Sequence, residues 1–303
     1  MTKHTSFVKK KKCWKKPQMR DIARLTWSII RFGILLGLCF MIIYPYIVKI
    51  LNTFKSYPDY LDPTVRYIPK YFTLDNLTTI LEQMNYKKTL ITTVLYSSLI
   101  ALIEVIVSAL AGYGLARIKF KGNKLLFMLV IFELLVPPQT VFMPMYIKFR
   151  FFYGGLNLIN TYWPGIILAC TGLGIKNGLF IFMFRQFFKN MPKELEEAAY
   201  VDGCSVFKTF FKVMLPNAVT LMVTVFLFAF AWQWTDTTNT TLYMRNTELM
   251  ANAVNNVNGG ELSSLVVAYN NSGAMLAVLP IALVYLVGQK FFIQSVERSG
   301  ITG

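Results

Sequence analysis

The sequence predicts an all-helical membrane protein with six transmembrane helices. The prediction depends on a 55% apolar content, a charged content of only 15%, and six long apolar stretches separated by polar segments. Soluble domains have about 25% charged residues, and a bilayer core about 30 Å thick requires about 20 mostly apolar helical residues per crossing. This composition argues against a soluble enzyme and excludes a disordered chain.

The six apolar stretches cover residues 27–47, 89–115, 125–147, 162–184, 217–234 and 273–292. The first is too long for the apolar region of a signal peptide and lacks a small-x-small cleavage site, so we interpret it as an uncleaved span. Pro137 and Pro138 interrupt the third stretch. They predict either a simple helix end or freed backbone carbonyls beside a wet cavity.

The basic residues predict the orientation of these spans. With the N-terminus inside, 20 of the 31 Lys and Arg residues lie in inner segments, 9 lie in outer segments, and Arg31 and Lys176 lie within spans. This excess follows the positive-inside rule and places both termini in the cytoplasm. Nine of the basic residues fall in the first 24 positions, against the single acid Asp21. Such a run favours contact with anionic membrane lipid, and no nucleic-acid partner is expected.

The expected organisation is a basic cytoplasmic tail and elbow over residues 1–26, followed by one transmembrane domain over residues 27–303. This domain has outer loops at 51–88 and 235–272 and a cytoplasmic loop at 185–216. The four cysteines have no CxxC or metal-ligand spacing, and the lone histidine, His4, lies in the tail. We therefore expect neither a disulfide framework nor a metal site.

The cytoplasmic loop 185–216 predicts a short helix, a sharp turn and a second helix. Pro192 suits the first turn of a helix, and Glu194 suits its positive end. Gly203 can adopt the left-handed conformation that stops a helix, and Ser205 can cap the next one. An ordinary amphipathic loop helix is the alternative interpretation.

The same loop contains a spaced set of residues: Glu197-Ala198-Ala199, then Gly203 after three residues, Val213 after nine more, and Leu215-Pro216 one residue beyond. This set resembles the EAA loop of ABC-transporter permeases, whose pattern is EAA-x3-G-x9-I-x-L-P. Val213 replaces the usual isoleucine, which is a conservative apolar change. Asp202, directly before the glycine, also fits the family pattern.

Further segments extend the resemblance from about residue 74 to the C-terminus. They are GYGLARIKFKGNKLL, LLVPPQTVFMPMY, LNLINTYWPG and QKFFIQSVERSGITG. All are similar to the carbohydrate-importing subclass, to which the second permease subunit of the maltose transporter belongs. The resemblance implies the helical bundle of a type I ABC importer permease, located in the cell membrane.

The resemblance also implies a set of partners. A second, paralogous permease subunit would complete the path, with a heterodimer expected and a homodimer left open. Two ATPase subunits would bind ATP and Mg, and an extracytoplasmic solute-binding protein would deliver a carbohydrate, expected to be an oligosaccharide. The chain has no GxxxxGK[ST] phosphate loop. We therefore expect no cofactor in this chain and no enzymatic activity of its own.

In the family, the EAA helix docks on an ATPase subunit and transmits its closure. Carried over to this chain, the coupling residues are those of the family pattern: Glu197, Ala198, Ala199, Asp202, Gly203, Leu215 and Pro216. Lys193, Glu194, Glu196 and Glu197 would offer charged contacts at the rim of the docking site.

Charged residues within spans are costly, and they are functional candidates for that reason. Glu104, Glu133 and Lys176 are the notable cases, and each could line the substrate path or pair across helices. Lys176 and Asn177 lie in the glycine-rich stretch 172–178, where polar groups could bind sugar hydroxyls.

The aromatic end of the fifth span supplies the last candidates for the path, namely Trp232, Gln233 and Trp234. They could anchor the helix at the membrane interface or stack on sugar rings.

Two other function classes fit the sequence less well. An ion-coupled secondary transporter of a small polar solute predicts inverted repeats, which the sequence does not show, and leaves the EAA-like loop unexplained. An intramembrane enzyme requires an HExxH motif or a nucleophile and base, and the sequence offers neither. The permease interpretation accounts for the loop and for the apolar composition together.

Overall fold

The computed structural model describes residues 19–257 and 263–300, so most of the basic tail lies outside the described residues. The described residues are almost all helical, and strand-like pairing within them is limited to the isolated bridges Lys55–Phe72 and Phe152–Leu156. The chain divides into two units, Met1–Lys49 and Ile50–Gly303, which are described separately.

Helix α1 (Met19–Thr53) forms the described part of the first unit and continues into the second. It is 35 residues long and contains Pro45. Its stretch Arg24–Thr53 contains an 18-residue window with a mean hydropathy of 2.3, so it is long and apolar enough to cross a bilayer. The span predicted at residues 27–47 lies within this helix.

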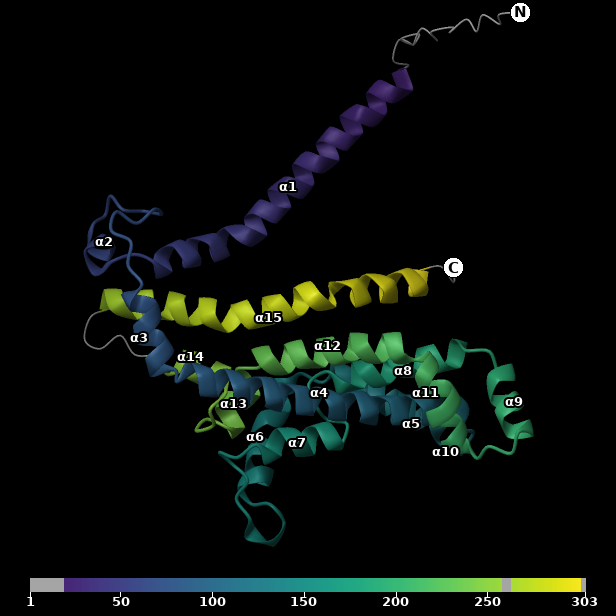
Figure 1. The fold of residues 1–303 in the computed structure, drawn as a ribbon. Helices are drawn as coiled ribbons and strands as arrows, with labels where there is room; N and C mark the ends of the chain where they lie inside the picture. Colours follow the sequence, from purple (N-terminus) through teal and green to yellow (C-terminus); the bar gives the residue numbers. More distant parts are fainter. Residues whose placement is uncertain (1–18, 258–262, 301–303) are drawn as a thin grey trace, which may run out of the picture. The chain divides into compact units, whose positions relative to one another are not determined.

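The second unit contains the remaining elements shown in Figure 1. They are α2 (Tyr57–Leu61), α3 (Asp75–Gln83), α4 (Tyr86–Arg117), α5 (Asn123–Leu135), α6 (Pro138–Arg150), η1 (Tyr153–Gly155), α7 (Trp163–Cys170), α8 (Asn177–Asn190), α9 (Glu194–Val201), α10 (Val206–Thr209), the π-helical η2 (Phe210–Met214), α11 (Leu215–Asn217), α12 (Val219–Thr235), α13 (Thr238–Tyr243), α14 (Met250–Asn255) and α15 (Ser263–Gly300).

Helix α4 is the centre of the second unit, because it packs most extensively against α8 and α12. Its buried face repeats every four residues, which places these side chains along one side of the helix. The apolar members of this face are Ala101, Val105, Ala109 and Tyr113. Helix α8 contributes Phe180, Phe184 and Phe188 to this contact, and all three side chains are completely buried. The main core therefore forms along the length of α4.

Two of the six predicted stretches are broken helices in the structure: the third breaks at the proline pair that the sequence marks as an interruption, and the fourth has a break that the sequence analysis does not predict. The stretch 125–147 breaks between α5 and α6, which are bent by 101°. Pro137 and Pro138 explain this break, because proline lacks the N–H that would continue the helix. The stretch 162–184 breaks at residues 171–176, where Gly172 and Lys176 have φ angles of +76° and +61°.

The number of helices that could cross a membrane is lower than six when counted by length and composition. Among the described residues, three stretches qualify individually: Arg24–Thr53, Tyr86–Arg117 and Leu265–Lys290. The count rises to five if each of two bent pairs is one span. These pairs are α5 with α6, and Val206–Asn217 with α12, the second bent by 78°.

The contact between α4 and α8 generates a prediction about Gly112. A Cβ atom at Gly112 would lie 2.6 Å from the Phe184 Cβ, whereas one at Gly114 would meet nothing within 4 Å. Gly112→Ala should therefore destabilise the protein by about 1–3 kcal/mol through overpacking. Gly114→Ala should stabilise it by about 0.5–1 kcal/mol through reduced backbone entropy. Thermal unfolding of the two purified variants in detergent compares them directly, and equal stabilities would contradict the close helix approach.

Candidate functional site

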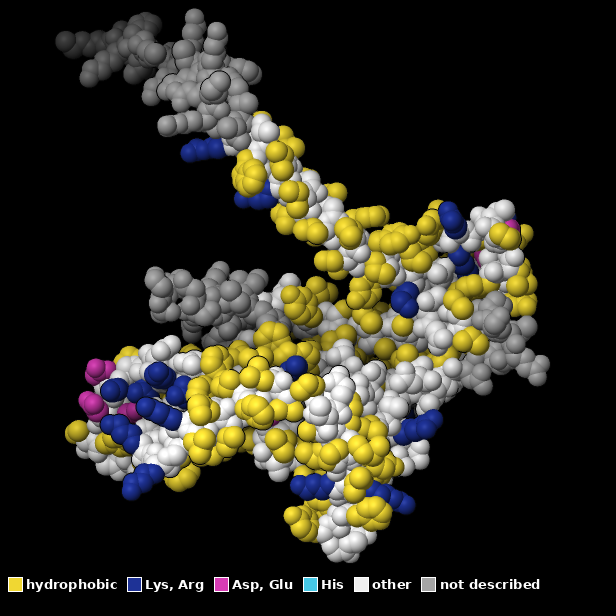
Figure 2. Space-filling view, turned by 180° about the vertical axis from the view of Figure 1, so that it is seen from behind, with side chains coloured by type: hydrophobic (Ala, Val, Ile, Leu, Met, Phe, Trp, Pro, Cys, Tyr) yellow, Lys and Arg dark blue, Asp and Glu magenta, His cyan; other side chains and the backbone are white. Residues whose placement is uncertain are grey.

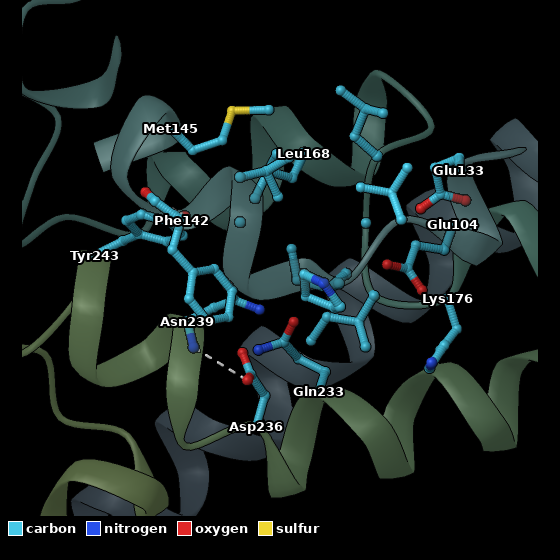
Figure 3. Close-up of a pocket in the computed structure, with 18 of the residues that line it drawn as sticks. Glu104, Glu133, Phe142, Met145, Leu168, Lys176, Gln233, Asp236, Asn239 and Tyr243 are labelled. Carbon is cyan, nitrogen blue, oxygen red and sulfur yellow. Dashed lines mark hydrogen bonds between the residues drawn. The ribbon is translucent and has the colours of Figure 1, made fainter. Parts of the chain in front are cut away.

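A cavity of about 410 Å³ lies where the broken helices meet. Residues of α4, α5, α6, α7, the break before α8, the end of α12, and α13 all line it (Figure 3). Its polar lining consists of Glu104, Glu133, Lys176, Gln233, Asp236, Asn239 and Tyr243. The structure therefore brings together four of the residues singled out from the sequence: Glu104, Glu133, Lys176 and Gln233.

The two glutamates rest on the glycine-rich break. A Cβ atom at Gly174 would overlap the Glu104 Oε1 atom, and one at Gly178 would overlap the Glu133 Oε2 atom. The Glu104 carboxylate lies beside the backbone of Ile175, and the Glu133 carboxylate lies beside that of Gly178. The absence of side chains at these two glycines gives the carboxylates room to reach the backbone of the break.

One carboxylate oxygen of each glutamate can still accept hydrogen bonds. Glu104 is only 1% exposed, and its Oε1 has no hydrogen-bond partner among the described residues. The same holds for the Glu133 Oε2. Buried carboxylate oxygens in a roomy polar cavity are satisfied by water or by the donor groups of a ligand. The cavity wall therefore offers free acceptors.

Lys176 is at the edge of this cavity. It is the residue before α8, in a left-handed conformation, and its side chain is exposed. The ion pairs found among the described residues do not include it, so no carboxylate lies within 4 Å of its amine there. Figure 3 shows the amine directed away from the Glu104 and Glu133 carboxylates. The structure thus does not lock Lys176 to Glu133.

Asn177 and Trp232 lie near the cavity without lining it. Asn177 is fully buried and accepts a hydrogen bond from the Ser108 hydroxyl, which joins α8 to α4. The Trp232 ring stacks on Phe180 with a centroid distance of 5.4 Å, which joins α12 to α8.

Trp234 is 4% exposed, and its Nε1 donates to the Ala277 carbonyl at 3.0 Å. This hydrogen bond joins α12 to α15. The three side chains Asn177, Trp232 and Trp234 therefore hold together the helices that surround the cavity.

Three lining residues, Asp236, Asn239 and Tyr243, were not selected as site residues from the sequence. Asp236 follows α12, accepts a hydrogen bond from the Asn239 backbone N–H at 3.1 Å, and keeps its Oδ2 without a partner among the described residues. Burial raises the pKa of the Asp236 carboxyl. The available signal was the acid directly after an apolar span, whereas Asn239 and Tyr243 lie in a Thr- and Asn-rich segment that resembles a loop.

The predicted helix of the cytoplasmic loop is present as α9, although Pro192 precedes it rather than occupying its first turn. Its end is closed by two hydrogen bonds, from the Cys204 N–H to the Ala199 carbonyl at 2.9 Å and from the Gly203 N–H to the Tyr200 carbonyl at 3.0 Å. Gly203 has a φ angle of +76°. These features define a Schellman motif, in which glycine takes the left-handed position.

The second part of this segment also forms as predicted. Ser205 caps α10 by accepting a hydrogen bond from the Lys208 backbone N–H at 3.4 Å. Leu215 and Pro216 then open α11 after the π-helical turn η2. Figure 1 shows α9 beyond the ends of α4, α8 and α12.

Exposed groups of two kinds occur on the segment from α9 to η2. Glu197 and Ala198 are exposed, and Ala199 is buried. Val201 and Phe207 are 88% and 72% exposed. Figure 2 shows charged side chains gathered at this end of the second unit, and the exposed ones of the segment include Lys193, Glu194, Glu197, Asp202, Lys208 and Lys212. Apolar side chains this exposed, surrounded by charge, are typical of a protein contact.

Glu196 corrects one expectation about this segment. The side chain is only 7% exposed and accepts a hydrogen bond from the Tyr113 hydroxyl at 2.9 Å. It also pairs with Arg117, at 3.4 Å between Nε and Oε2. Glu196 therefore faces α4 and is not the exposed rim contact predicted from the sequence.

Comparison with known proteins agrees with this architecture. The family model for the binding-protein-dependent transport system inner membrane component matches residues 104–298. The probable ABC transporter permease protein YurM of Bacillus subtilis is 27% identical over 294 residues, covering 94% of this chain and 93% of that protein. The arabinooligosaccharides transport system permease protein AraQ of the same organism is 29% identical, covering 78% and 81% of the two chains.

A solved structure shows the same fold. It is a chain of a bacterial ABC transporter involved in the import of the acidic polysaccharide alginate, with a TM-score of 0.72 and 18% sequence identity. The match covers 95% of this chain and all of the other. Since the family model spans well over half of the sequence, the chain is a multi-pass membrane protein that belongs to the inner membrane components of binding-protein-dependent transport systems, and it is a transport permease rather than an enzyme.

Proposed function

We propose that this chain is the transmembrane permease subunit of an ATP-driven importer for an oligosaccharide and forms half of the translocation path. The observation that carries the proposal is α9, an exposed helix closed by a Schellman turn at Gly203, with the residue spacing of the EAA loop. In this proposal, α9 docks on one of two ATPase subunits, and those subunits hold ATP and Mg.

The surface around α9 supports a docking role. A partner that buries the exposed Val201 and Phe207 side chains gains apolar contact area. The exposed Glu197 and Asp202 side chains, together with Lys193 and Lys208, give charged groups at the rim of the same surface. Leu215 and Pro216 continue the segment into α12, so the docked helix is connected directly to a membrane helix.

The cavity supports a carbohydrate as cargo. Its lining offers the carboxylates of Glu104, Glu133 and Asp236, and Gln233 and Asn239 add amides. Sugar hydroxyls are hydrogen-bond donors and acceptors, so they match these polar groups, which stand in an otherwise mostly apolar wall. Relatives are named for transport of arabinooligosaccharides, of starch degradation products, and of melibiose, raffinose and stachyose.

The proposed topology has six crossings with both termini in the cytoplasm. Helices α1, α4 and α15 would each cross once, and α5 with α6, α7 with α8, and α12 would supply three more. A second permease subunit, expected to be a paralogue, would complete the path, and an extracytoplasmic solute-binding protein would deliver the cargo. The excess of basic residues in the inner segments supports this orientation.

The coupling role predicts a specific defect for Gly203→Val. A β-branched residue resists the φ angle of +76°, at a cost of about 1–3 kcal/mol, and redirects the segment that follows α9. Cargo-stimulated ATP hydrolysis by the purified transporter should fall by more than about tenfold, the factor that corresponds to about 1.4 kcal/mol, and uptake should fail.

The matched control for this experiment is Gly122→Val. Gly122 also has a positive φ angle, +94°, and a Cβ atom there would meet nothing within 4 Å, but it lies before α5 and outside the coupling segment. We expect this variant to retain cargo-stimulated hydrolysis. A Gly203→Val transporter that keeps its ATPase subunits and hydrolyses ATP normally in response to cargo would contradict the coupling assignment.

The position of Lys176 predicts that its charge serves transport rather than assembly. Lys176→Met should lower uptake in proteoliposomes while the yield of assembled transporter stays the same, because the side chain is exposed and outside the observed ion pairs. Lys189→Met, near the far end of the same helix, is the control and should leave uptake unchanged. Loss of assembly that Glu133→Gln restores would instead establish a structural pair between the two residues.

Ion-coupled secondary transport is the less favoured function, because no observation in the structure supports it. The two functions differ in their energy source. Uptake that continues in an ion gradient after ATP is removed would overturn the proposed function.

A further inference from the structure

Three buried side chains join α9 to the cytoplasmic end of α4. Glu196 accepts a hydrogen bond from the Tyr113 hydroxyl at 2.9 Å and pairs with Arg117 at 3.4 Å. The side chains of Arg117 and Glu196 are 8% and 10% exposed. We call this group of three residues, Tyr113, Arg117 and Glu196, the α4–α9 clamp.

The α4–α9 clamp is tied to its surroundings on both sides. Arg117 donates from Nη2 to the Met191 carbonyl at 2.5 Å, so it also holds the linker that leads from α8 into α9. The Tyr113 ring packs against Phe188 and Phe210, with centroid distances of 5.6 Å and 4.9 Å. The clamp therefore connects α4, α8, α9 and η2 at one point.

An ion pair in such a place is better suited to fixing geometry than to adding stability. Burying two charges costs solvation energy that their attraction only partly returns, and apolar replacements of buried pairs are often as stable. The hydrogen bond from the Tyr113 hydroxyl gives the Glu196 carboxylate a defined direction, and the Arg117 guanidinium adds charge attraction, whereas apolar contacts allow sliding. Ala199, which is 6% exposed, adds a small apolar side chain to the buried face of α9.

We propose that the α4–α9 clamp makes α9 and α4 move as one rigid body and thereby transmits the displacement of α9 to the cavity. The inference rests on the proposed function, in which an ATPase subunit moves α9. Helix α4 runs without a break from Tyr86 to Arg117 and contains no proline. Glu104, which lines the cavity, lies on this helix about 20 Å before Arg117, at 1.5 Å per residue.

The clamp thus allows motion of α9 to reach the cavity through side-chain contacts, in addition to the path along the connected chain. The chain connects α9 to the cavity through the linker to α8 and through α10, η2 and α12. The clamp adds α4, whose Glu104 carboxylate lies against Gly174 in the break before α8. Glu196 is a positioning residue in this proposal, since it acts on the cargo site only through α4.

The test uses the complete transporter in proteoliposomes, with Glu196→Gln and Tyr113→Phe as separate variants. Glu196→Gln removes the charge and keeps the shape, and Tyr113→Phe removes one hydroxyl and keeps the ring in its aromatic cluster. Nitroxide labels at Leu110 of α4 and Leu195 of α9, both exposed and outside the proposed docking contacts, report the distance between the helices. Glu82→Gln, the same exchange on the exposed side of α3, is the control.

We expect the unmodified transporter to give one narrow distance distribution that is unchanged by ATP binding. Both clamp variants should broaden this distance distribution. The ratio of cargo-stimulated to basal ATP hydrolysis should fall by about tenfold in Glu196→Gln and by a smaller factor in Tyr113→Phe. The yield of assembled transporter should remain, and Glu82→Gln should behave as the parent. If the Glu196→Gln transporter does not assemble, the results for Tyr113→Phe alone test the proposal, because that variant keeps all the apolar packing.

Two results would overturn the proposal. The first is a distance between α4 and α9 that changes when ATP binds to the unmodified transporter, because the two helices would then not move as one body. The second is an unaltered distribution and hydrolysis ratio in both clamp variants. If the unmodified transporter shows no cargo-stimulated hydrolysis at all, the proposed function itself fails, and the transmitting role of the clamp fails with it.

Discussion

The hydrocarbon core of a bilayer contains no water to satisfy backbone polar groups, so a helix can be interrupted there only where its freed groups meet protein or a wet cavity. The interruptions in this chain follow that constraint. The break between α5 and α6 and the break before α8 both line the same cavity. The carboxylates of Glu104 and Glu133 lie against Gly174 and Gly178 at the second break. The cavity, its acidic wall and the broken helices therefore depend on one another.

The same constraint relates the two functional regions of the molecule. Helix α4 is uninterrupted, and it carries a cavity carboxylate at Glu104 and a buried ion pair with α9 at Arg117. Helices α5 and α7, which are short and broken, line the cavity around it. The uninterrupted α4 beside the short helices α5 and α7 suits a subunit in which the motion of one long helix displaces shorter neighbours.

Much of the fold could be predicted from the sequence, because apolar length is a direct signal of spanning helices. The stretches at 27–47, 89–115, 217–234 and 273–292 all lie in or largely overlap described helices. The stretch at 162–184 appeared continuous because its break is made by glycines in an apolar context, and hydropathy does not distinguish a helical glycine from one with a φ angle of +76°. The proline pair did signal the break at 137–138.

The candidate site was predictable where local chemistry specifies it. Gly203 and Ser205 have defined roles at helix ends, and the structure shows both roles. Glu196 was misassigned because sequence distance hides its partner Arg117, which lies 79 positions earlier in the chain. Asp236 was recognisable as an acid after a span, but its place in the cavity depends on the path of α13, which no local pattern predicts.

The seating of Glu104 on the break before α8 has a consequence for how the protein is made. Glu104 lies on α4, and Gly174, against which its carboxylate lies, is synthesised 70 residues later. At about 5–20 residues per second, this interval lasts roughly 4 to 14 seconds. During that time α4 carries a carboxyl group without its native partner, at a cost of about 3 kcal/mol for an ionised group at the bilayer centre. Nascent α4 therefore bears this cost until the residues of the break before α8 have been synthesised.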